Sequence, residues 1–345
     1  MKYKQKLLFI SNSSPNRINH ILDAFKNRDD LIVEELHQYK NNIKRTFFTK
    51  VFDKLKLPLD IDNLNQRLLN KIDEFKPDII FIVKGNVIYP WSLKKIKNKY
   101  PNIKLISFSN DNMSLWNNKS LYYHYSINYY DLVISIRIEA YKKIEKFCKT
   151  NVIYIDKSYS KKYHTFNYYD DKYKKYDVVF VGSYEKERFE TMKYLANKGI
   201  KIDIFGAMWN KVKNKQISSN LNIHFKEVVG DKYSETLRSA KIVLGFLRQK
   251  NLDTQTSRTF EIPATGAFVI MQWTSNQDRL FKSNQEMVYF KDKEDLFKKI
   301  QYYLNNEEER KKIIDNAKLR MEKCGYSYDS RVDYILKKIR RLDNV

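Results

Sequence analysis

The sequence is poor in cysteine and in long apolar runs, and each shortage excludes a class of protein. Its 345 residues include two cysteines, Cys148 and Cys324, which lie far apart without metal-ligand spacing. They therefore indicate neither a disulfide framework nor a zinc site. The apolar run near the N-terminus spans about five residues, too few for a signal peptide and far below the roughly 18 that a membrane-spanning helix needs. We therefore expect a cytoplasmic protein, with the inner face of the membrane as a further option.

Acidic residues are too few to balance the basic ones. The chain carries 65 Lys and Arg against 41 Asp and Glu, a formal net charge of +24. Such a charge suits a nucleic acid, an anionic membrane surface or an acidic substrate. The lysines are spread along the whole chain and alternate with Asp and Glu, which favours a coding bias. We expect no nucleic-acid partner, because no basic face with interleaved aromatics is visible. We keep peripheral contact with an anionic membrane as an alternative role for the charge.

What the chain does contain is a series of short apolar runs, separated by stretches of helical period. Runs that are apolar throughout and alternate with helices predict parallel sheets covered on both faces, and so an α/β fold. The expected strands are 6–11, 78–83, 103–109, 131–136 and 151–156, then 177–183, 201–206, 222–225, 241–246 and 267–271.

A polar segment rich in aromatics, 158–176, interrupts this rhythm. We interpret it as the linker between two Rossmann-like domains, one over 1–165 and one over 166–330. A basic amphipathic helix, 331–345, closes the chain and could pack back on the N-terminal domain. Loops at the carboxyl ends of strands in both domains would then face a shared central cleft.

The glycines are distributed unevenly, which bears on nucleotide binding. A dinucleotide fingerprint needs glycines after the first strand, so that the backbone can approach a pyrophosphate. The first expected strand instead runs into SNSSPNR, which has no glycine. NAD binding in the N-terminal domain is therefore not expected, although Ser and Asn of this loop could cap the first helix.

The expected strand at 177–183 leads into a helix that carries Arg188 in its first turns. Gly182 lets the chain turn without a Cβ clash, and Ser183 follows it. A helix N-terminus with a nearby cation suits a phosphate group. The alternative is a plain turn between strand and helix with a surface arginine.

The stretch DTQTSRTFEIPATGAFVIMQW, residues 253–273, holds the strongest site signal. Pro263 lacks an amide hydrogen and is comfortable only in a first helical turn, which predicts a helix start within 257–260. The amides just ahead of this point would be free to meet an anion, and an arginine guanidinium would add a bidentate contact. The residues that we expect to bind the anion are Thr256, Ser257 and Arg258.

Two carboxylates flank this predicted helix start. Glu261 lies in the same turn and can accept two hydrogen bonds from vicinal hydroxyls, such as those of a ribose. Asp253 precedes the helix and would lie on the opposite side of the phosphates. Together these residues describe a site for a nucleoside diphosphate that bears a sugar. The alternative is an ordinary crossover in which Glu261 pairs with a lysine.

Four of these motifs resemble one known family. SRTFEIPATGAFVI, KIVLGFLRQKN, DVVFVGSYEKER and IDIFGAMW are similar to motifs of the CgeB-like (spore maturation protein) glycosyltransferases. The similarity covers most of the C-terminal half and extends weakly into the N-terminal half through FKPDIIFIVKG, LISFSNDNMSLW and VIYIDKSYSKKYH. It implies the GT-B fold related to glycosyltransferase families 1 and 4, with two Rossmann-like domains whose parallel sheets face a central cleft. It also implies that the second domain holds most of the donor, without an obligatory metal.

The resemblance implies roles for individual residues. Relatives of the family-4 type carry two Glu separated by seven residues, and here Asp253 takes the first place and Glu261 the second. The resemblance implies that Glu261 binds the ribose, the segment 256–258 the diphosphate, and Asp253 the donor sugar. Arg188 stands six positions after Gly182, where relatives carry a basic residue that neutralises the leaving diphosphate. Retention of anomeric configuration is expected from the kept spacing alone.

Candidates for a catalytic base lie in the N-terminal domain. Asp111 follows the expected strand 103–109 and is the better placed, whereas His124 is more typical of a packed aromatic cluster. Tyr89 and Trp116 could stack on an acceptor sugar, although such aromatics are commonly core residues. We expect Asp111 and Asp253 to be the catalytic residues.

The expected substrates are a nucleotide sugar, linked to UDP, GDP or dTDP, and a glycan, protein or lipid-linked acceptor. We expect the base to contact the segments 205–209 and 228–233, and we expect no metal and no cofactor. Two alternatives stay open: a basic nucleic-acid-binding protein, and an inactive protein that still binds a nucleotide sugar.

Overall fold

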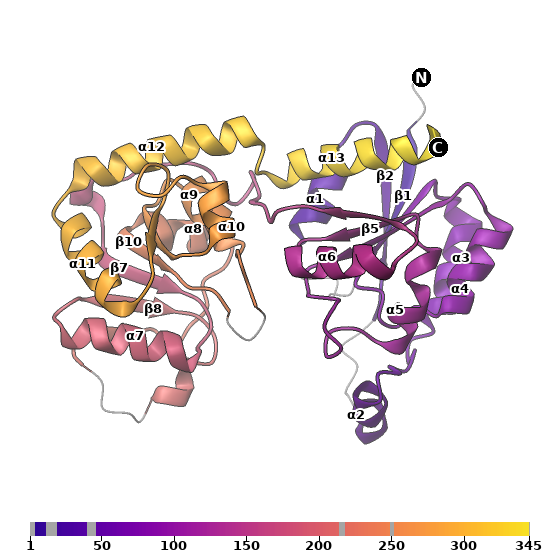
Figure 1. Cartoon of the computed structure of the whole chain (residues 1–345), viewed down its shortest axis with the longest axis horizontal. Helices are drawn as coiled ribbons and strands as arrows, with labels where there is room; N and C mark the ends of the chain where they lie inside the picture. The colour runs from indigo at the N-terminus through magenta and orange to yellow at the C-terminus, as the bar shows by residue number, and fades with distance from the viewer. Residues whose placement is uncertain (1–3, 12–18, 40–45, 214–217, 249–251, 345) are drawn as a thin grey trace. The chain divides into compact units, whose positions relative to one another are not determined.

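The computed structural model describes residues 4–11, 19–39, 46–213, 218–248 and 252–344. The chain divides into two compact units, Met1–Asp156 with Asp329–Val345, and Lys157–Tyr328 (Figure 1). The division after Asp156 lies before the expected boundary at 165. The loop over 12–18, where we expected helix-capping Ser and Asn, lies outside the described residues.

The first unit is built on a six-stranded parallel sheet in the order β2-β1-β3-β4-β5-β6. Its apolar runs form strands because they can be buried from both sides. The strands are β1 (Gln5–Ser11), β2 (Leu31–His37), β3 (Ile79–Val83), β4 (Lys104–Ser109), β5 (Leu132–Ser135) and β6 (Asn151–Tyr154). The helices are α1 (His20–Lys26), α2 (Phe47–Lys54), α3 (Leu64–Phe75), α4 (Pro90–Lys99), α5 (Leu121–Ser126), α6 (Ile138–Phe147) and α13 (Tyr328–Arg340).

The second unit repeats this plan with a parallel sheet in the order β12-β11-β10-β7-β8-β9. The strands are β7 (Tyr176–Val181), β8 (Ile202–Phe205), β9 (Leu221–Ile223), β10 (Ala240–Gly245), β11 (Val269–Gln272) and β12 (Val288–Phe290). The helices are α7 (Lys186–Asn197), α8 (Asp231–Arg238), α9 (Arg258–Ala264), α10 (Ser275–Leu280), α11 (Lys293–Leu304) and α12 (Glu307–Cys324). None of the helices in the described ranges is both long enough and apolar enough to cross a bilayer.

Alternating side chains of one strand serve two separate cores, which confirms a sheet covered on both faces. On β7, Val178 and Phe180 pack into one apolar cluster, while Val179 and Val181 pack into the other. All four are nearly or fully buried. This arrangement explains why the strand is apolar at every position. The α/β fold with two parallel sheets is as the sequence predicts.

The segment 158–176 is packed against the second unit, so our interpretation of it as a linker is wrong. Tyr159 pairs with Ser327 in a β-bridge, and its amide donates to the Tyr326 carbonyl at 3.2 Å. His164 is buried and accepts a hydrogen bond from the Ser160 amide at 3.0 Å. The segment is therefore part of the second unit and not a flexible linker between the two units.

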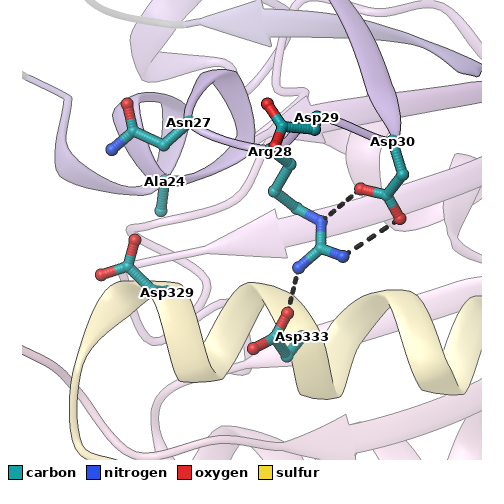
Figure 2. Close-up of a pocket in the computed structure, with 7 residues that line it drawn as sticks. All are labelled: Ala24, Asn27, Arg28, Asp29, Asp30, Asp329 and Asp333. Carbon is teal, nitrogen blue, oxygen red and sulfur yellow. Dashed lines mark hydrogen bonds and ion pairs between the residues drawn. The ribbon is translucent and has the colours of Figure 1, made fainter.

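Helix α13 belongs to the first unit, which holds it through an apolar face and ion pairs. Arg28 follows α1 and donates from Nε to Asp30 Oδ1 at 2.7 Å and from Nη2 to Asp30 Oδ2 at 3.0 Å. Figure 2 shows the same guanidinium between Asp30 and Asp333 of α13, with which it also pairs. Arg340 donates to Asp30 Oδ2 at 2.8 Å. The buried apolar side chains of α13 are Val332, Ile335, Leu336 and Ile339.

These contacts predict an acid-sensitive attachment of α13. The hydrogen bond from Arg28, ahead of one from Arg340, lowers the pKa of Asp30 from 3.8 to about 2. The ionised carboxylate therefore stabilises the folded state above the unfolded pKa of 3.8, and this stabilisation is lost as the pH falls towards 2. We expect the free energy of unfolding to fall less steeply between pH 5 and 3 in Asp30→Asn than in the parent chain. Chemical unfolding at several pH values measures this slope.

The neighbouring Asp29 provides the matched control. It lines the same surface pocket as Arg28 and Asp30 but forms no ion pair within the described part of the chain (Figure 2). Asp29→Asn should keep the slope of the parent chain. Equal slopes for all three proteins would show that Arg28 and Arg340 do not perturb Asp30 in the folded state.

Candidate functional site

The candidate site lies where the chain order in the second sheet reverses. From β7 the chain proceeds outward through β8 and β9, and it then returns to the other side of β7 to form β10, β11 and β12. Parallel sheets bind ligands beyond the carboxyl ends of the strands at such a reversal. The loops that follow β7 and β10 therefore border the expected site, and these loops carry both motifs singled out in the sequence.

Arg258 joins the two motifs physically. It is the first residue of α9, and its Nε donates to the carbonyl of Val181, the last residue of β7, at 2.7 Å. This bond leaves its two terminal nitrogens without an acceptor in the described part of the chain. The guanidinium thus lies beside the turn that contains Gly182 and Ser183, with donors still available for an anion.

The amides ahead of α9 are less available than we expected. The Thr256 amide donates to Thr259 Oγ1 at 3.1 Å, and the Arg258 amide donates to Thr256 Oγ1 at 3.0 Å. Two of the three amides predicted to be free are therefore used inside the turn, because threonine hydroxyls compete for them. The Ser257 amide has no acceptor among the described residues. An anion here would depend on side chains more than on backbone.

The start of α9 is as predicted, but the argument from Pro263 is wrong. Helix α9 runs from Arg258 to Ala264, so Pro263 lies beyond the first turn. The helix ends one residue later, so the missing amide hydrogen removes a bond only at its end.

Arg188 is the buried cation of this site. Arg188 is 7% exposed. Its Nη1 donates to the Ser183 carbonyl at 3.3 Å, and its Nη2 lies 3.5 Å from Glu185 Oε2. The buried Nε has no hydrogen-bond partner among the described residues. Arg188 therefore anchors the turn after β7 and retains an unsatisfied buried donor. A surface arginine, the alternative considered above, is excluded.

Arg248 is a third arginine that we did not anticipate. It follows β10, and its Nε lies 3.5 Å from Glu185 Oε1. Glu185 thus lies between Arg188 and Arg248, one carboxylate oxygen towards each. The signal available in the sequence was the position of Arg248 two residues after the end of the predicted strand 241–246.

The charges of Arg248 and Arg258 act on the buried Arg188. Burial lowers the pKa of Arg188, Glu185 raises it, and the charges of Arg258 and Arg248 lower it further. The pKa is also raised by Asp253, whose amide donates to the Arg248 carbonyl at 3.2 Å. This group therefore has excess positive charge, and a bound anion would relieve it. Asp253 therefore lies close enough to the arginines for its charge to act on Arg188.

Glu261 is held by a phenol and not by a lysine. Tyr233 of α8 donates from its hydroxyl to Glu261 Oε2 at 3.0 Å. Burial raises the pKa of Tyr233 well above 10, so the phenol stays protonated and remains a donor. Glu261 Oε1 accepts no hydrogen bond from the described residues. The carboxylate is therefore oriented and still has acceptor capacity for a hydroxyl pair.

Gly182 and Gly206 bring the loops after β7 and β8 into backbone contact. The Gly182 amide donates to the Phe205 carbonyl at 2.8 Å, and Trp209 Nε1 donates to the Gly182 carbonyl at 2.9 Å. Gly206 has a φ of +142°, and a Cβ there would lie 2.6 Å from the Gly182 carbonyl carbon. The glycine at position 206 thus permits the close approach of the two loops.

The two segments expected to contact the nucleotide base, 205–209 and 228–233, are only partly exposed. Phe205 is buried and its ring stacks on His224 at 4.1 Å, and Trp209 is 1% exposed. Those two side chains belong to the core. Met208 and Val229, at 51% and 68% exposed, are the accessible apolar side chains in the two segments.

The remaining candidates lie in the first unit. Asp111 follows β4 and pairs with Lys84, whose Nζ lies 2.6 Å from Asp111 Oδ2. The structure therefore brings Arg188, Arg258, Asp253 and Glu261 into one unit and places Asp111 in the other. The described residues contain no group of three or more His, Cys, Asp or Glu side chains that could hold a metal ion.

The aromatic candidates His124, Trp116 and Tyr89 belong to two groups of aromatic side chains in the first unit. His124 lies in a cluster with Trp116, Tyr125 and Phe147 at ring distances of 5.2–6.5 Å, as expected for a packed aromatic. Burial, ahead of the charge of Lys119, lowers its pKa. The other aromatic group comprises Tyr89, Trp91 and Tyr122, and Trp91 and Trp116 are 61% and 52% exposed.

Residues 186–337 match a family model described as glycosyl transferase-like. Among solved structures, sucrose-phosphate synthase from Thermosynechococcus elongatus is similar with a TM-score of 0.72 and 10% identity, over 99% of this chain and 100% of that one. HepE from Anabaena, solved with UDP and glucose, is similar with a TM-score of 0.63 and 12% identity, over 97% and 100%. No curated protein matches the chain.

A third similar structure was solved with DNA as well as UDP. An alpha-glucosyltransferase in complex with UDP and a 13-mer DNA is similar with a TM-score of 0.66 and 14% identity, over 99% of this chain and 100% of that one. These likenesses show that the two sheets form a GT-B fold. Together with the family model they make the chain a glycosyltransferase of the GT-B type, which confirms the enzyme class expected from the sequence.

Proposed function

We propose that the chain transfers a sugar from a nucleoside diphosphate sugar to a glycan, protein or lipid-linked acceptor. The observation that supports this most is the group of Arg188, Arg248 and Arg258 at the strand-order reversal of the second sheet. Its cations outnumber the nearby carboxylates of Glu185 and Asp253, and it leaves guanidinium donors available. A diphosphate supplies the missing negative charge.

In this proposal the ribose binds at Glu261, whose Oε1 is available and whose Oε2 is fixed by Tyr233. Asp253, beside the arginines, contacts the donor sugar. This assignment keeps the order that the sequence suggests, from ribose through diphosphate to sugar, along the start of α9. The role of Asp253 in this assignment rests on the resemblance to CgeB-like enzymes.

In the chemical step, the bond between the sugar C1 and the β-phosphate oxygen breaks and an acceptor hydroxyl forms the new bond to C1. Negative charge grows on the departing diphosphate, and guanidinium groups that are already positioned stabilise it without reorganisation. We expect these cations to serve in place of a metal ion. Asp111, held by Lys84 in the first unit, is our proposed general base for the acceptor hydroxyl. Retention stays a prediction from the spacing of Asp253 and Glu261.

The donor site predicts selective stabilisation by a nucleotide. A ligand at 100 times its Kd adds about 2.7 kcal/mol to the free energy of unfolding, which is a measurable shift in Tm. We expect UDP, GDP or dTDP, and the matching sugar conjugate, to produce such a shift in the parent chain. The neighbours solved with UDP make UDP the first choice. A flat response to every nucleotide would contradict the proposal, and a shift without sugar transfer would indicate an inactive binding protein.

Glu261→Ala should weaken the binding of that nucleotide roughly 10- to 100-fold, because hydrogen bonds to a charged group contribute about 1.5–3 kcal/mol. Isothermal titration calorimetry measures the change. Tyr233→Phe is the matched control, since it removes the hydroxyl from Glu261 Oε2 but keeps the carboxylate. It should change the Kd only a few-fold. Unaltered affinity in Glu261→Ala would place the ribose elsewhere.

A further inference from the structure

Helix α2, Phe47–Lys54, exposes apolar side chains where a helix of a folded domain normally buries them. Phe47 and Phe48 are 77% and 70% exposed, and Leu55, which follows the helix, is 58% exposed. The buried residue of α2 is the polar Thr49, whose hydroxyl donates to the Thr46 carbonyl at 2.9 Å. Figure 1 shows α2 set apart from the sheet of the first unit.

The exposed rings belong to one continuous apolar face. Side chains one turn apart lie on the same side of a helix, so spacings of three or four residues define a face. Polar residues occupy the other side, where Lys50 and Lys54 are exposed. The apolar face consists of Phe47, Phe48, Val51, Phe52 and Leu55.

The charge of the chain indicates what covers this face. The net charge of +24 is the same on every copy of the protein, so a second copy is repelled. An anionic bilayer attracts it, and a short helix with exposed aromatics on one side and lysines on the other is suited to lie in a membrane interface. We propose that α2 docks the protein on an anionic lipid surface, with Phe47 and Phe48 inserted among the lipids.

Helix α13, the basic helix singled out in the sequence, is not suited to the same role. Its apolar side chains Val332, Ile335 and Leu336 are buried in the first unit. It therefore offers Lys337 and Lys338 to a surface but no side chain to insert. This difference makes α13 a control for charge alone.

Co-sedimentation of the 345-residue chain with vesicles of phosphatidylglycerol and phosphatidylcholine in equal parts tests the proposal. The parent chain should bind these vesicles and not vesicles of phosphatidylcholine alone. The double variant Phe47→Ser, Phe48→Ser should bind at least about tenfold more weakly, because two apolar side chains no longer leave water. The double variant Lys337→Gln, Lys338→Gln should stay within about threefold of the parent chain.

The Phe47, Phe48 variant should keep the Tm of the parent chain, since the replaced rings are exposed. Equal vesicle binding by this variant and the parent chain would overturn the proposal, as would a parent chain that ignores anionic vesicles. A dimer in sedimentation equilibrium that the variant abolishes would also overturn it, in favour of contact between copies. None of these measurements depends on sugar transfer.

Discussion

Replacing Arg188 by Met should lower kcat/KM for sugar transfer roughly 100- to 1000-fold, because removing one preorganised donor to a developing anion costs about 2.7–4 kcal/mol. Methionine keeps much of the apolar contact that the side chain makes with Phe180, whose ring centroid lies 5.8 Å from the guanidinium carbon. Because negative charge grows on the diphosphate as the sugar leaves, kcat should fall more than KM rises. Steady-state kinetics with the donor found by Tm screening measures both.

Arg238 is a closely matched control in the same unit. It also donates to a backbone carbonyl, that of Thr165 at 3.1 Å, and lies 3.6 Å from a glutamate three residues earlier. Its guanidinium carbon lies 5.8 Å from the Tyr169 ring centroid. Its Nε, like that of Arg188, is buried and has no partner in the described part of the chain. Arg238→Met should therefore carry a similar structural cost with little change in kcat. Equal losses in the two variants would assign Arg188 a structural role only.

Gly206→Ala should destabilise the second unit by about 2–5 kcal/mol, from left-handed backbone strain and overpacking together. The φ of +142° disfavours any side chain, and the new Cβ would meet backbone atoms of Gly182 that cannot move aside. The clash would also separate the turn after β7 from the loop after β8. Urea unfolding followed by circular dichroism measures the loss, and limited proteolysis reports it where purification yields are low.

Gly199→Ala separates these two causes. Gly199 also has a positive φ, +91°, but nothing lies within 4 Å of a Cβ built there. This variant should cost only the conformational strain, about 1–2 kcal/mol. If Gly199→Ala and Gly206→Ala were equally destabilised, the contact with Gly182 would contribute nothing.

All ten runs identified as apolar became strands. In the inner strands, burial on two sides requires apolar residues at every position. The edge strands β6 and β9 were also identified, although Asn151 and Asn222 in them are exposed. The two strands that we missed lie at sheet edges. Strand β2 contains Glu34 and Glu35, and β12 has only the three residues Val288–Phe290. Partial exposure and short length remove the pattern that identifies a strand.

The site was predictable where it depends on neighbours in sequence and not where it depends on loops that meet in space. The helix start at Arg258 and the position of Arg188 follow from local patterns. The partners of Glu185 and Glu261 do not, because Arg248 and Tyr233 come from other segments. The amides at Thr256 and Arg258 were misjudged because two threonine hydroxyls accept from them. Hydroxyl orientation depends on the turn geometry, which the sequence does not specify.

The attachment of α13 has a consequence for the order in which the protein forms during synthesis. The buried side chains of α13 complete the first unit, yet they follow the whole second unit in the chain. A ribosome adding about 5–20 residues per second therefore needs on the order of ten seconds or more between the last strand of the first sheet and the helix that covers it. The nascent first unit must spend that interval with an uncovered apolar surface, while the second unit can already fold.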